Sequence, residues 1–319
     1  MRLWGIGLAL GAYALATVPA LAAPHVATVA THMPRGMTAA DIAIEPDGTA
    51  YVQGESLSKE ALYPDVYVYS SAGKLLRKLA IPPETQLEAY GNGQLYVGRE
   101  MAENIYGISP VTGATLSAVG AHNEYFPGTL GFPHGVAVSP AGTIYVSGGE
   151  IGIPERSDPD SIETIQDPIE TFSPSGAYSG YIQPQLREPG AVGVLSANAA
   201  GDVLANWATP QGIGAEGVLS PQGAALTQFT VFTPKPEVKG GSFSADGNSV
   251  YAGVVVKHGA AGTTFIAKLS LSGKILEKFG SLPTHNVANF WEYTAVDVAA
   301  NGDGWAVRAV PGTLYRFHL

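Results

Sequence analysis

The chain has 319 residues, of which 45% are apolar and only 14% charged, with 40 Gly and 23 Pro. So many Gly and Pro residues favour frequent turns over long helices. The formal net charge of −10 argues against nucleic-acid binding, because phosphates attract Lys and Arg. The chain contains no cysteine, which excludes a disulfide framework and a thiol nucleophile.

The N-terminus has the features of a secretory signal peptide. Arg2 precedes an apolar run that extends to about Val18, and Ala20-Leu21-Ala22 supplies a small-x-small cleavage pattern. We therefore expect residues 1–22 to be a signal peptide and residues 23–319 to form one periplasmic or secreted domain. An uncleaved anchor is the alternative. We expect no membrane span after cleavage, because no other apolar run is long enough to cross a bilayer.

A short unit recurs along the predicted domain. Each copy has a Gly in a turn, followed three residues later (four in one copy) by an aromatic residue or Leu, and an apolar strand precedes most of these turns. The pairs are Gly48 and Tyr51, Gly93 and Tyr96, Gly142 and Tyr145, Gly201 and Leu204, Gly247 and Tyr251, and Gly302 and Trp305. A second turn follows in most copies, at Gly73, Gly113, Gly176, Gly223 and Gly273.

Each unit predicts four strands with tight turns after the first and the third. Successive turn glycines lie between 45 residues (Gly48 to Gly93) and 59 residues (Gly142 to Gly201) apart. Four strands at this period are typical of a β-propeller. A β-sandwich is the alternative, although a sandwich need not repeat its turns at a constant offset.

The last copy lacks a fourth strand. Trp305-Ala306-Val307 and Thr313-Leu314-Tyr315-Arg316-Phe317 supply its second and third strands, and the chain then ends at Leu319. The segment His25–Thr31 offers a spare strand that can complete this blade and cover its open edge. The sequence therefore predicts an all-β, six-bladed β-propeller closed by an N-terminal strand that joins the last blade.

The repeat also carries a family resemblance. The run Phe132-Pro133-His134-Gly135-Val136-Ala137-Val138, followed by Gly142-Thr143-Ile144-Tyr145-Val146, resembles the NHL repeat. More broadly, the chain resembles the six-bladed propellers that include gluconolactonase-like (senescence-marker-protein) and NHL proteins. The resemblance covers nearly the whole predicted domain, but its motifs mark turns and strands and say little about activity. We expect His134 to stand just before an inner strand. In NHL-type lyases, a histidine in this Pro-His setting binds a metal, which implies a metal ligand at His134.

The loops of variable length contain the candidate site residues. Such loops on a rigid scaffold commonly carry function. His122, His134 and His285 are candidate metal ligands, because imidazoles that converge from different blades can hold zinc or act as acid and base. His134 and Glu292 are the candidate catalytic residues. The alternative is that each histidine is an ordinary loop residue.

The longest insertion, residues 149–171, is rich in carboxylates. Its sequence Asp158-x-Asp160-x-x-Glu163 brings together three oxygen ligands of the kind that Ca²⁺ prefers, but without the spacing of an EF-hand. A solvated acidic lid is the alternative. A divalent metal, zinc or calcium, is the one cofactor that the sequence suggests.

The gluconolactonase resemblance implies a divalent ion at the channel, held by a Glu at the start of an early inner strand, by Asn residues and by an Asp base. In this chain Asp41 begins the first inner strand. The segment Lys239–Gly247 resembles the family's Asn-Gly-x-x-x-Ser-Pro-Asp-Gly segment but lacks its Asn, and Tyr251-Ala252-Gly253 lacks the Asp that follows. These departures argue against lactonase chemistry, and Asp246 is simply explained as a turn residue.

Aromatic residues in the variable loops suit stacking against a ligand, or packing of the loops onto the blades. They are Tyr63, Tyr125, Phe126, Phe290 and Trp291. We therefore expect an exported, monomeric, NHL-like propeller that binds a small molecule or a protein through its loop-rich face. The alternative is a metal-dependent lactonase (a hydrolase) or lyase with His122, His134, His285 and Glu292 at the channel mouth.

Overall fold

The structure is a computed structural model. It describes residues 25–34, 37–56, 65–83, 85–99, 104–120, 133–148, 150–154, 162–186, 192–208, 214–229, 237–258, 261–284, 295–308 and 313–319. Within these ranges, no helix is long and apolar enough to cross a membrane.

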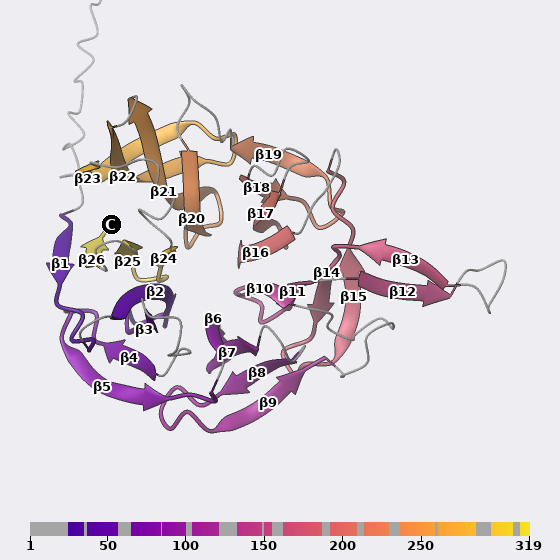
Figure 1. Cartoon of the computed structure of the whole chain (residues 1–319). Helices are drawn as coiled ribbons and strands as arrows, with labels where there is room; N and C mark the ends of the chain where they lie inside the picture. Colours follow the sequence, from indigo (N-terminus) through magenta and orange to yellow (C-terminus); the bar gives the residue numbers. More distant parts are fainter. Residues whose placement is uncertain are drawn as a thin grey trace, which may run out of the picture.

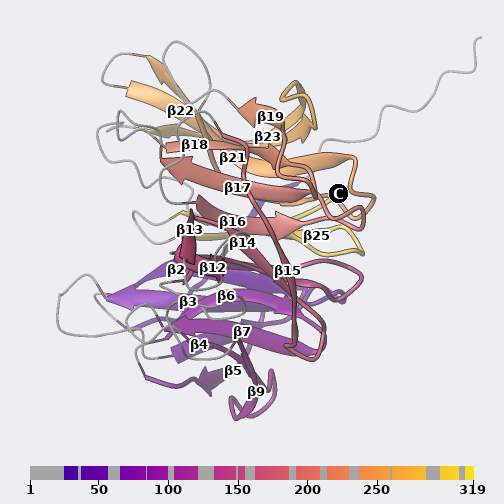
Figure 2. The ribbon, with the colours of Figure 1, turned by 90° about the vertical axis from the view of Figure 1, so that its right-hand side faces the viewer.

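Six antiparallel four-stranded sheets surround a central axis, which confirms the six-bladed β-propeller (Figure 1). Viewed from the side, the blades follow one another as tilted layers (Figure 2). Blade 1 consists of β2 (Met37–Ile44), β3 (Ala50–Ser56), β4 (Asp65–Tyr69) and β5 (Leu75–Ala80). Blade 2 consists of β6 (Gln86–Gly91), β7 (Gln94–Arg99), β8 (Asn104–Ile108) and β9 (Thr115–Val119). Blade 3 consists of β10 (Pro133–Val138), β11 (Ile144–Gly148), β14 (Ile169–Phe172) and β15 (Tyr178–Ile182).

The second half of the ring repeats this order from the axis outward. Blade 4 consists of β16 (Val192–Ala197), β17 (Val203–Ala208), β18 (Gly214–Leu219) and β19 (Ala225–Phe229). Blade 5 consists of β20 (Glu237–Phe243), β21 (Ser249–His258), β22 (Ala261–Ser270) and β23 (Ile275–Thr284). Blade 6 consists of β24 (Ala295–Val298), β25 (Asp303–Arg308), β26 (Thr313–His318) and β1 (Ala27–Val29).

Strand β1 closes the ring as the sequence predicts. It pairs antiparallel with β26, with Val29 opposite Leu314, and forms the outer strand of blade 6. Val29 is buried in the apolar cluster between blades 6 and 1. The edge of β26, which would otherwise be open, is thereby covered.

The core lies between the blades, and a separate apolar cluster fills each of the six blade–blade contacts. The aromatic residues of the repeat lie in this core; Tyr51, Tyr96 and Trp305 are almost fully buried. Apolar burial of this kind is the main favourable contribution to folding. In each repeated pair, the glycine therefore forms a turn and the aromatic residue (leucine in blade 4) packs in the core between the blades.

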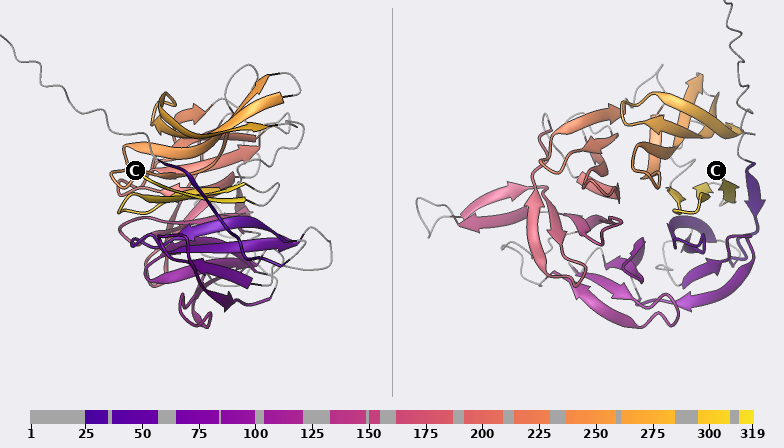
Figure 3. Two further views of the ribbon diagram at one scale, coloured as in Figure 1. Left: turned by 90° about the vertical axis from the view of Figure 1, so that its left-hand side faces the viewer. Right: turned by 180° about the vertical axis from the view of Figure 1, so that it is seen from behind.

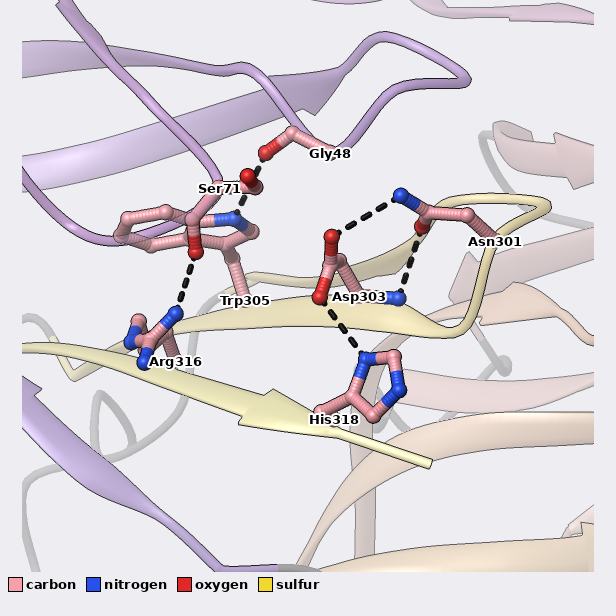
Figure 4. A network of polar contacts seen from close by, with 7 residues as sticks. All are labelled: Gly48, Ser71, Asn301, Asp303, Trp305, Arg316 and His318. Atoms are coloured by element: carbon pink, nitrogen blue, oxygen red, sulfur yellow. Dashed lines mark hydrogen bonds and ion pairs between the residues drawn. The ribbon is translucent and has the colours of Figure 1, made fainter.

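Polar contacts reinforce the junction between the last and first blades (Figure 4). The indole Nε1 of Trp305 donates to the carbonyl of Gly48 at 3.2 Å, and the Arg316 guanidinium donates to the carbonyl of Ser71. Asp303 accepts from Asn301 Nδ2 and contacts His318 Nδ1, each at 2.9 Å. Blade 6 thus holds both Gly-containing turns of blade 1.

Three details differ from the sequence-based expectations. The first inner strand, β2, begins at Met37, so Asp41 lies within it. His134 lies inside β10, whereas we expected it just before the strand. The blade 3 insertion contains a hairpin, β12 (Glu150–Pro154) and β13 (Ile162–Gln166), where we expected only a loop. The two strands pair along all five residues, and their isoleucines, Ile151 and Ile153 in β12 and Ile162 and Ile165 in β13, are residues that favour strands.

Candidate functional site: the central channel

The inner strands of all six blades line a cavity of about 310 Å³. Its lining includes residues from the middle and early parts of these strands, such as Asp41, Gln86 and Gly240. These strands are entered from the variable loops that join one blade to the next. A second cavity of about 410 Å³ lies towards the first turns of the blades, around Asn92, Pro140 and Asn198.

The two cavities are parts of one channel. Both are lined by Tyr90, Val138, Ser196, Ser242 and Asp297, which form the waist between them. We call the first cavity the loop-side cavity and the second the turn-side cavity.

The loop-side cavity is acidic and polar. Its lining includes the carboxylates of Asp41, Glu88 and Asp297, contributed by blades 1, 2 and 6. Amide and hydroxyl groups come from Gln86, Asn206, Ser196 and Ser242. The described lining contains no Lys or Arg. A cleft lined with one sign of charge attracts ligands of the opposite sign, so this cavity suits a cation.

Hydrogen bonds between blades 1 and 2 fix the residues around Glu88. Gln53 is fully buried; its Oε1 accepts from Leu87 N at 2.5 Å and its Nε2 donates to Thr85 O at 2.8 Å. Gln86 Nε2 donates to Asp41 Oδ2 at 3.0 Å. The segment directly before Glu88 is therefore tied to blade 1.

β-bulges change the direction of the inner strands at the cavity. The pairing register of β6 shifts between Leu87 and Ala89, so Glu88 is an extra residue. The register of β10 shifts between Pro133 and Gly135, which makes His134 the extra residue of blade 3. Bulges re-aim side chains and are common beside active sites. A Cβ atom on Gly98 would lie 3.0 Å from Glu88 Oε1, so glycine at that position leaves room for the carboxylate.

Asp297 lies at the waist and connects three blades. Its Oδ2 accepts from Ile44 N of blade 1 at 3.1 Å, and its Oδ1 accepts from Val298 N at 2.8 Å. Ser242 of blade 5 also accepts from Val298 N, at 3.0 Å. Burial raises the pKa of the Asp297 carboxyl, and these hydrogen bonds partly counter that shift.

The structure brings only some of the predicted site residues to the channel. Asp41 lines the loop-side cavity, and the backbone of His134 directly precedes the lining residue Gly135. His122, His285 and Glu292, like the five loop aromatics, lie outside the described residues. Among the part of the chain that the structure describes, no three His, Asp or Glu residues come together as a group that could hold a metal.

Four other residues singled out from the sequence have structural roles or lie outside the described part. Asp158 and Asp160 are not described, and Glu163 belongs to β13. Asp246 stabilises its turn by accepting from Ser244 Oγ at 2.5 Å and from Asn248 N at 3.1 Å. The bond from Ser244 is the main reason that the pKa of Asp246 lies below its ordinary value. The turn interpretation of Asp246 is therefore supported.

Sequence reasoning missed three lining residues. Glu88 lies in the second copy of the repeat, one of two copies whose inner strand is only weakly apolar, and Asp297 was counted only as part of an apolar strand. Asn206 comes from a second strand, β17, and faces Gly193 of β16 in the register. A charged residue within an otherwise apolar inner strand was the signal that could have identified Glu88 and Asp297.

The comparisons support the fold and leave the family open. No protein-family model matches the sequence, and no curated protein matches it. Among solved structures, the luciferin-regenerating enzyme is 11% identical with a TM-score of 0.53, over 93% of this chain and 95% of that one. The Cps50 (Swd1) β-propeller domain of Myceliophteria thermophila is 10% identical with a TM-score of 0.53, over 91% of this chain and 100% of that one. A structure of streptogramin B lyase is 11% identical over 93% of this chain and 98% of that one, with a TM-score of 0.48. The chain is therefore similar to β-propellers in fold.

Proposed function

We propose that this protein is an exported binding module that takes a small cationic ligand into the loop-side cavity. The observation that carries the proposal is the lining of that cavity, which has three carboxylates from blades 1, 2 and 6 and no Lys or Arg among its described residues. Two of these carboxylates, Asp41 and Glu88, belong to blades joined by the Gln53 bridge. A preformed, rigid site of this kind loses little free energy on ordering when it binds.

The first experiment measures binding of Ca²⁺, Zn²⁺ and spermidine by calorimetry and by the shift in unfolding temperature. We expect at least one of these probes to bind, and the variants Asp41→Asn and Glu88→Gln each to weaken its affinity by about tenfold, which equals about 1.4 kcal/mol. Glu277→Gln on the outer strand β23 is the matched control and should leave the affinity unchanged. Absence of binding by every probe, or binding that survives both channel substitutions, contradicts the proposal.

A metal-dependent lactonase or lyase is the second candidate function. The observation that favours it is the bulge at His134, beside a cavity that already contains Asp41 and Glu88. His122 and His285 would complete a metal site, with Glu292 as a second catalytic group. Metal analysis of protein purified without an affinity tag tests this. Stoichiometric metal that His134→Ala removes would favour the enzyme, whereas metal-free protein would exclude it.

The prediction that the protein is exported depends on residues 1–22, which lie outside the described structure. We propose that these residues are removed after Ala22, so that the exported protein starts at Ala23. N-terminal sequencing of protein from the periplasmic fraction tests this directly. A chain that still begins at Met1, or that stays with the cytoplasmic fraction, contradicts export by this route.

A further inference from the structure

The turn-side cavity differs in chemistry from the loop-side cavity, although the two belong to one channel. Seen from either face, the six inner strands surround the axis of this channel (Figures 1 and 3). In five blades, the residue two positions before the first turn glycine lines the mouth of the turn-side cavity. These residues are Pro46, Pro140, Ala199, Ala245 and Ala300, and all five are exposed. None of them has a polar side-chain atom, so the mouth is a ring of small apolar side chains.

The walls behind this ring are largely apolar as well. Four different blades contribute apolar side chains to them, from Ile44, Val138, Phe243 and Val298. The cavity measures about 410 Å³, which lies within the range of about 300–1,000 Å³ that is typical of small-molecule sites. Such sites are mostly apolar and have a few convergent polar groups. The turn-side cavity therefore has the size and the walls of a site for a small molecule.

The amide side chains at this end are occupied within the turns. Asn92 Nδ2 donates to Tyr96 Oη at 3.1 Å and to Gly142 O at 2.9 Å. Asn198 Oδ1 accepts from two backbone N–H groups of its own turn, at 3.0 and 2.9 Å. These amides therefore shape the turns, and the polar contacts of a ligand must come from deeper in the channel.

The charges at this end of the channel select against ions. The described lining of the turn-side cavity contains no Lys, Arg, His or Glu. Its carboxylate, Asp297 at the waist, already accepts from Ile44 N and Val298 N, one with each oxygen. An anion would therefore meet only negative charge. A cation would have to compete with backbone N–H groups for Asp297, so a neutral ligand fits this cavity best.

Two hydroxyl groups at the waist can hold the polar part of such a ligand. Tyr90 stacks on Tyr51 with their ring centres 6.2 Å apart, which fixes its ring against blade 1. Burial raises the pKa of the Tyr90 hydroxyl above its ordinary value, and the carboxylates of Glu45 and Asp47 add to the shift. Both carboxylates belong to the first turn of blade 1, so the Tyr90 hydroxyl lies towards the turn end. Ser196 Oγ accepts from the backbone of blade 5 at 3.2 Å, and its O–H is a donor as well.

We propose that the turn-side cavity is a second ligand site, for a compact, neutral, largely apolar molecule that carries one hydroxyl or carbonyl oxygen. That oxygen accepts from the hydroxyls of Tyr90 and Ser196 at the waist. The apolar part of the ligand lies between the walls and the ring of Pro and Ala side chains at the mouth. This site is separate from the cation site in the loop-side cavity, and neither proposal depends on the other.

Three probes of similar shape and different charge test the proposal: benzyl alcohol, benzoate and benzylammonium. Calorimetry and ligand-observed NMR measure their binding to the purified protein. We expect benzyl alcohol to bind with a Kd on the order of 1 mM, as suits so small a ligand. Benzoate should bind at least about tenfold more weakly, because the cavity offers it no positive charge. Benzylammonium should not displace benzyl alcohol.

Substitutions at the mouth and at the waist locate the binding. Ala199→Trp and Ala300→Trp, each made alone, should cover the mouth and weaken the binding of benzyl alcohol at least about tenfold. Ala200→Trp is the matched control, because Ala200 is exposed in the same turn but does not line the cavity. Tyr90→Phe should weaken the binding of benzyl alcohol by about fivefold, the effect of one lost hydrogen bond, and leave the binding of toluene unchanged.

Failure of benzyl alcohol to bind overturns the proposal, as does binding that survives both mouth substitutions. Equal affinity for benzoate, or displacement by benzylammonium, would show that the site does not select a neutral ligand and is equally decisive. Asp41→Asn should leave the binding of benzyl alcohol unchanged, so a failure of the cation site and a failure of this site are distinguishable. The two mouth substitutions belong to different blades, so one of them tests the site even if the other variant folds poorly.

Discussion

At the scale of single residues, the inner ring is held by side chains that accept a hydrogen bond from the next blade. Asp297 accepts from Ile44 N, Ser242 accepts from Val298 N, and Ser196 accepts from Phe243 N at 3.2 Å. Blades 1 and 3 use Gln53 and Ser147 of their second strands instead. Polar groups that line the channel therefore also join the blades, which keeps the cavity rigid.

Asp297 allows a pH test of this arrangement. Its folded-state pKa is raised by burial, so the folded protein keeps the carboxyl proton at pH values where the unfolded chain has lost it. The folded state is therefore destabilised as pH rises through the ordinary Asp pKa of about 4 up to the raised folded value. We expect Asp297→Asn, which cannot ionise, to gain stability relative to the wild type over that interval.

Urea unfolding of both proteins between pH 4 and pH 8 measures the difference. A difference in unfolding free energy that does not change with pH would contradict the raised pKa. Asp297→Ala removes the acceptor for the Ile44 N–H and should cost about 1–3 kcal/mol at all pH values.

At the scale of elements, the outer strands share a bulge just after their turn. In five blades the register between the third and fourth strands shifts by one residue. The extra residue is leucine in four of them, at Leu76, Leu116, Leu226 and Leu276, each about half exposed. A bulged residue has no cross-strand partner, which explains the exposure. These bulges also twist the open edges away from regular pairing.

The first turns of the blades offer a matched stability test. Gly48 and Gly93 both adopt a positive φ, +88° and +72°, so alanine at either position is strained by roughly 1–2 kcal/mol. A Cβ atom at Gly93 meets nothing within 4 Å, whereas one at Gly48 would collide with Asp303 and lie 2.9 Å from Ser71 Cβ. We expect Gly48→Ala to be clearly more destabilising than Gly93→Ala in denaturant unfolding. Equal losses would show that the junction of blades 6 and 1 can relax.

At the scale of the whole molecule, the ring depends on contacts between the two ends of the chain. β1 pairs with β26 inside blade 6, while Trp305 and Arg316 bind the turns of blade 1. The apolar cluster that includes Val29, Tyr69 and Trp305 fills the same junction. Closure therefore combines a strand pair, polar contacts and a buried core.

Removal of residues 23–30 tests the importance of β1. The deletion exposes the edge of β26 and removes Val29 from the core, for which we expect a loss of at least about 2 kcal/mol. Aggregation should increase as well. A synthetic peptide of residues 23–31 should bind the truncated protein and restore its unfolding temperature. Unchanged stability after truncation would mean that blade 6 is complete with three strands.

The sequence by itself determined the repeating four-stranded unit and the closure of the ring by an N-terminal strand. The Gly–aromatic spacing depends on neighbours within one hairpin, so it could be read locally, and it identified all six blades and the completing strand around Val29. The candidate site could be predicted only in part. Asp41 lines the channel, and the sequence analysis had singled it out. The insertion in blade 3 forms a hairpin, which its composition did not distinguish from an acidic loop.

Only the tertiary structure decided which polar residues meet at the axis. Asp297 and Ile44 are 253 positions apart, and Asn206 reaches the cavity from a second strand. Bulges displace Glu88 and His134 by one residue relative to the simple alternation of a strand. A charge within an apolar inner strand can mark Glu88 and Asp297 as candidates, but both effects depend on ring closure and on pairing between strands, so a local pattern does not predict which residues meet at the axis. The acidic channel is thus a property of the closed ring.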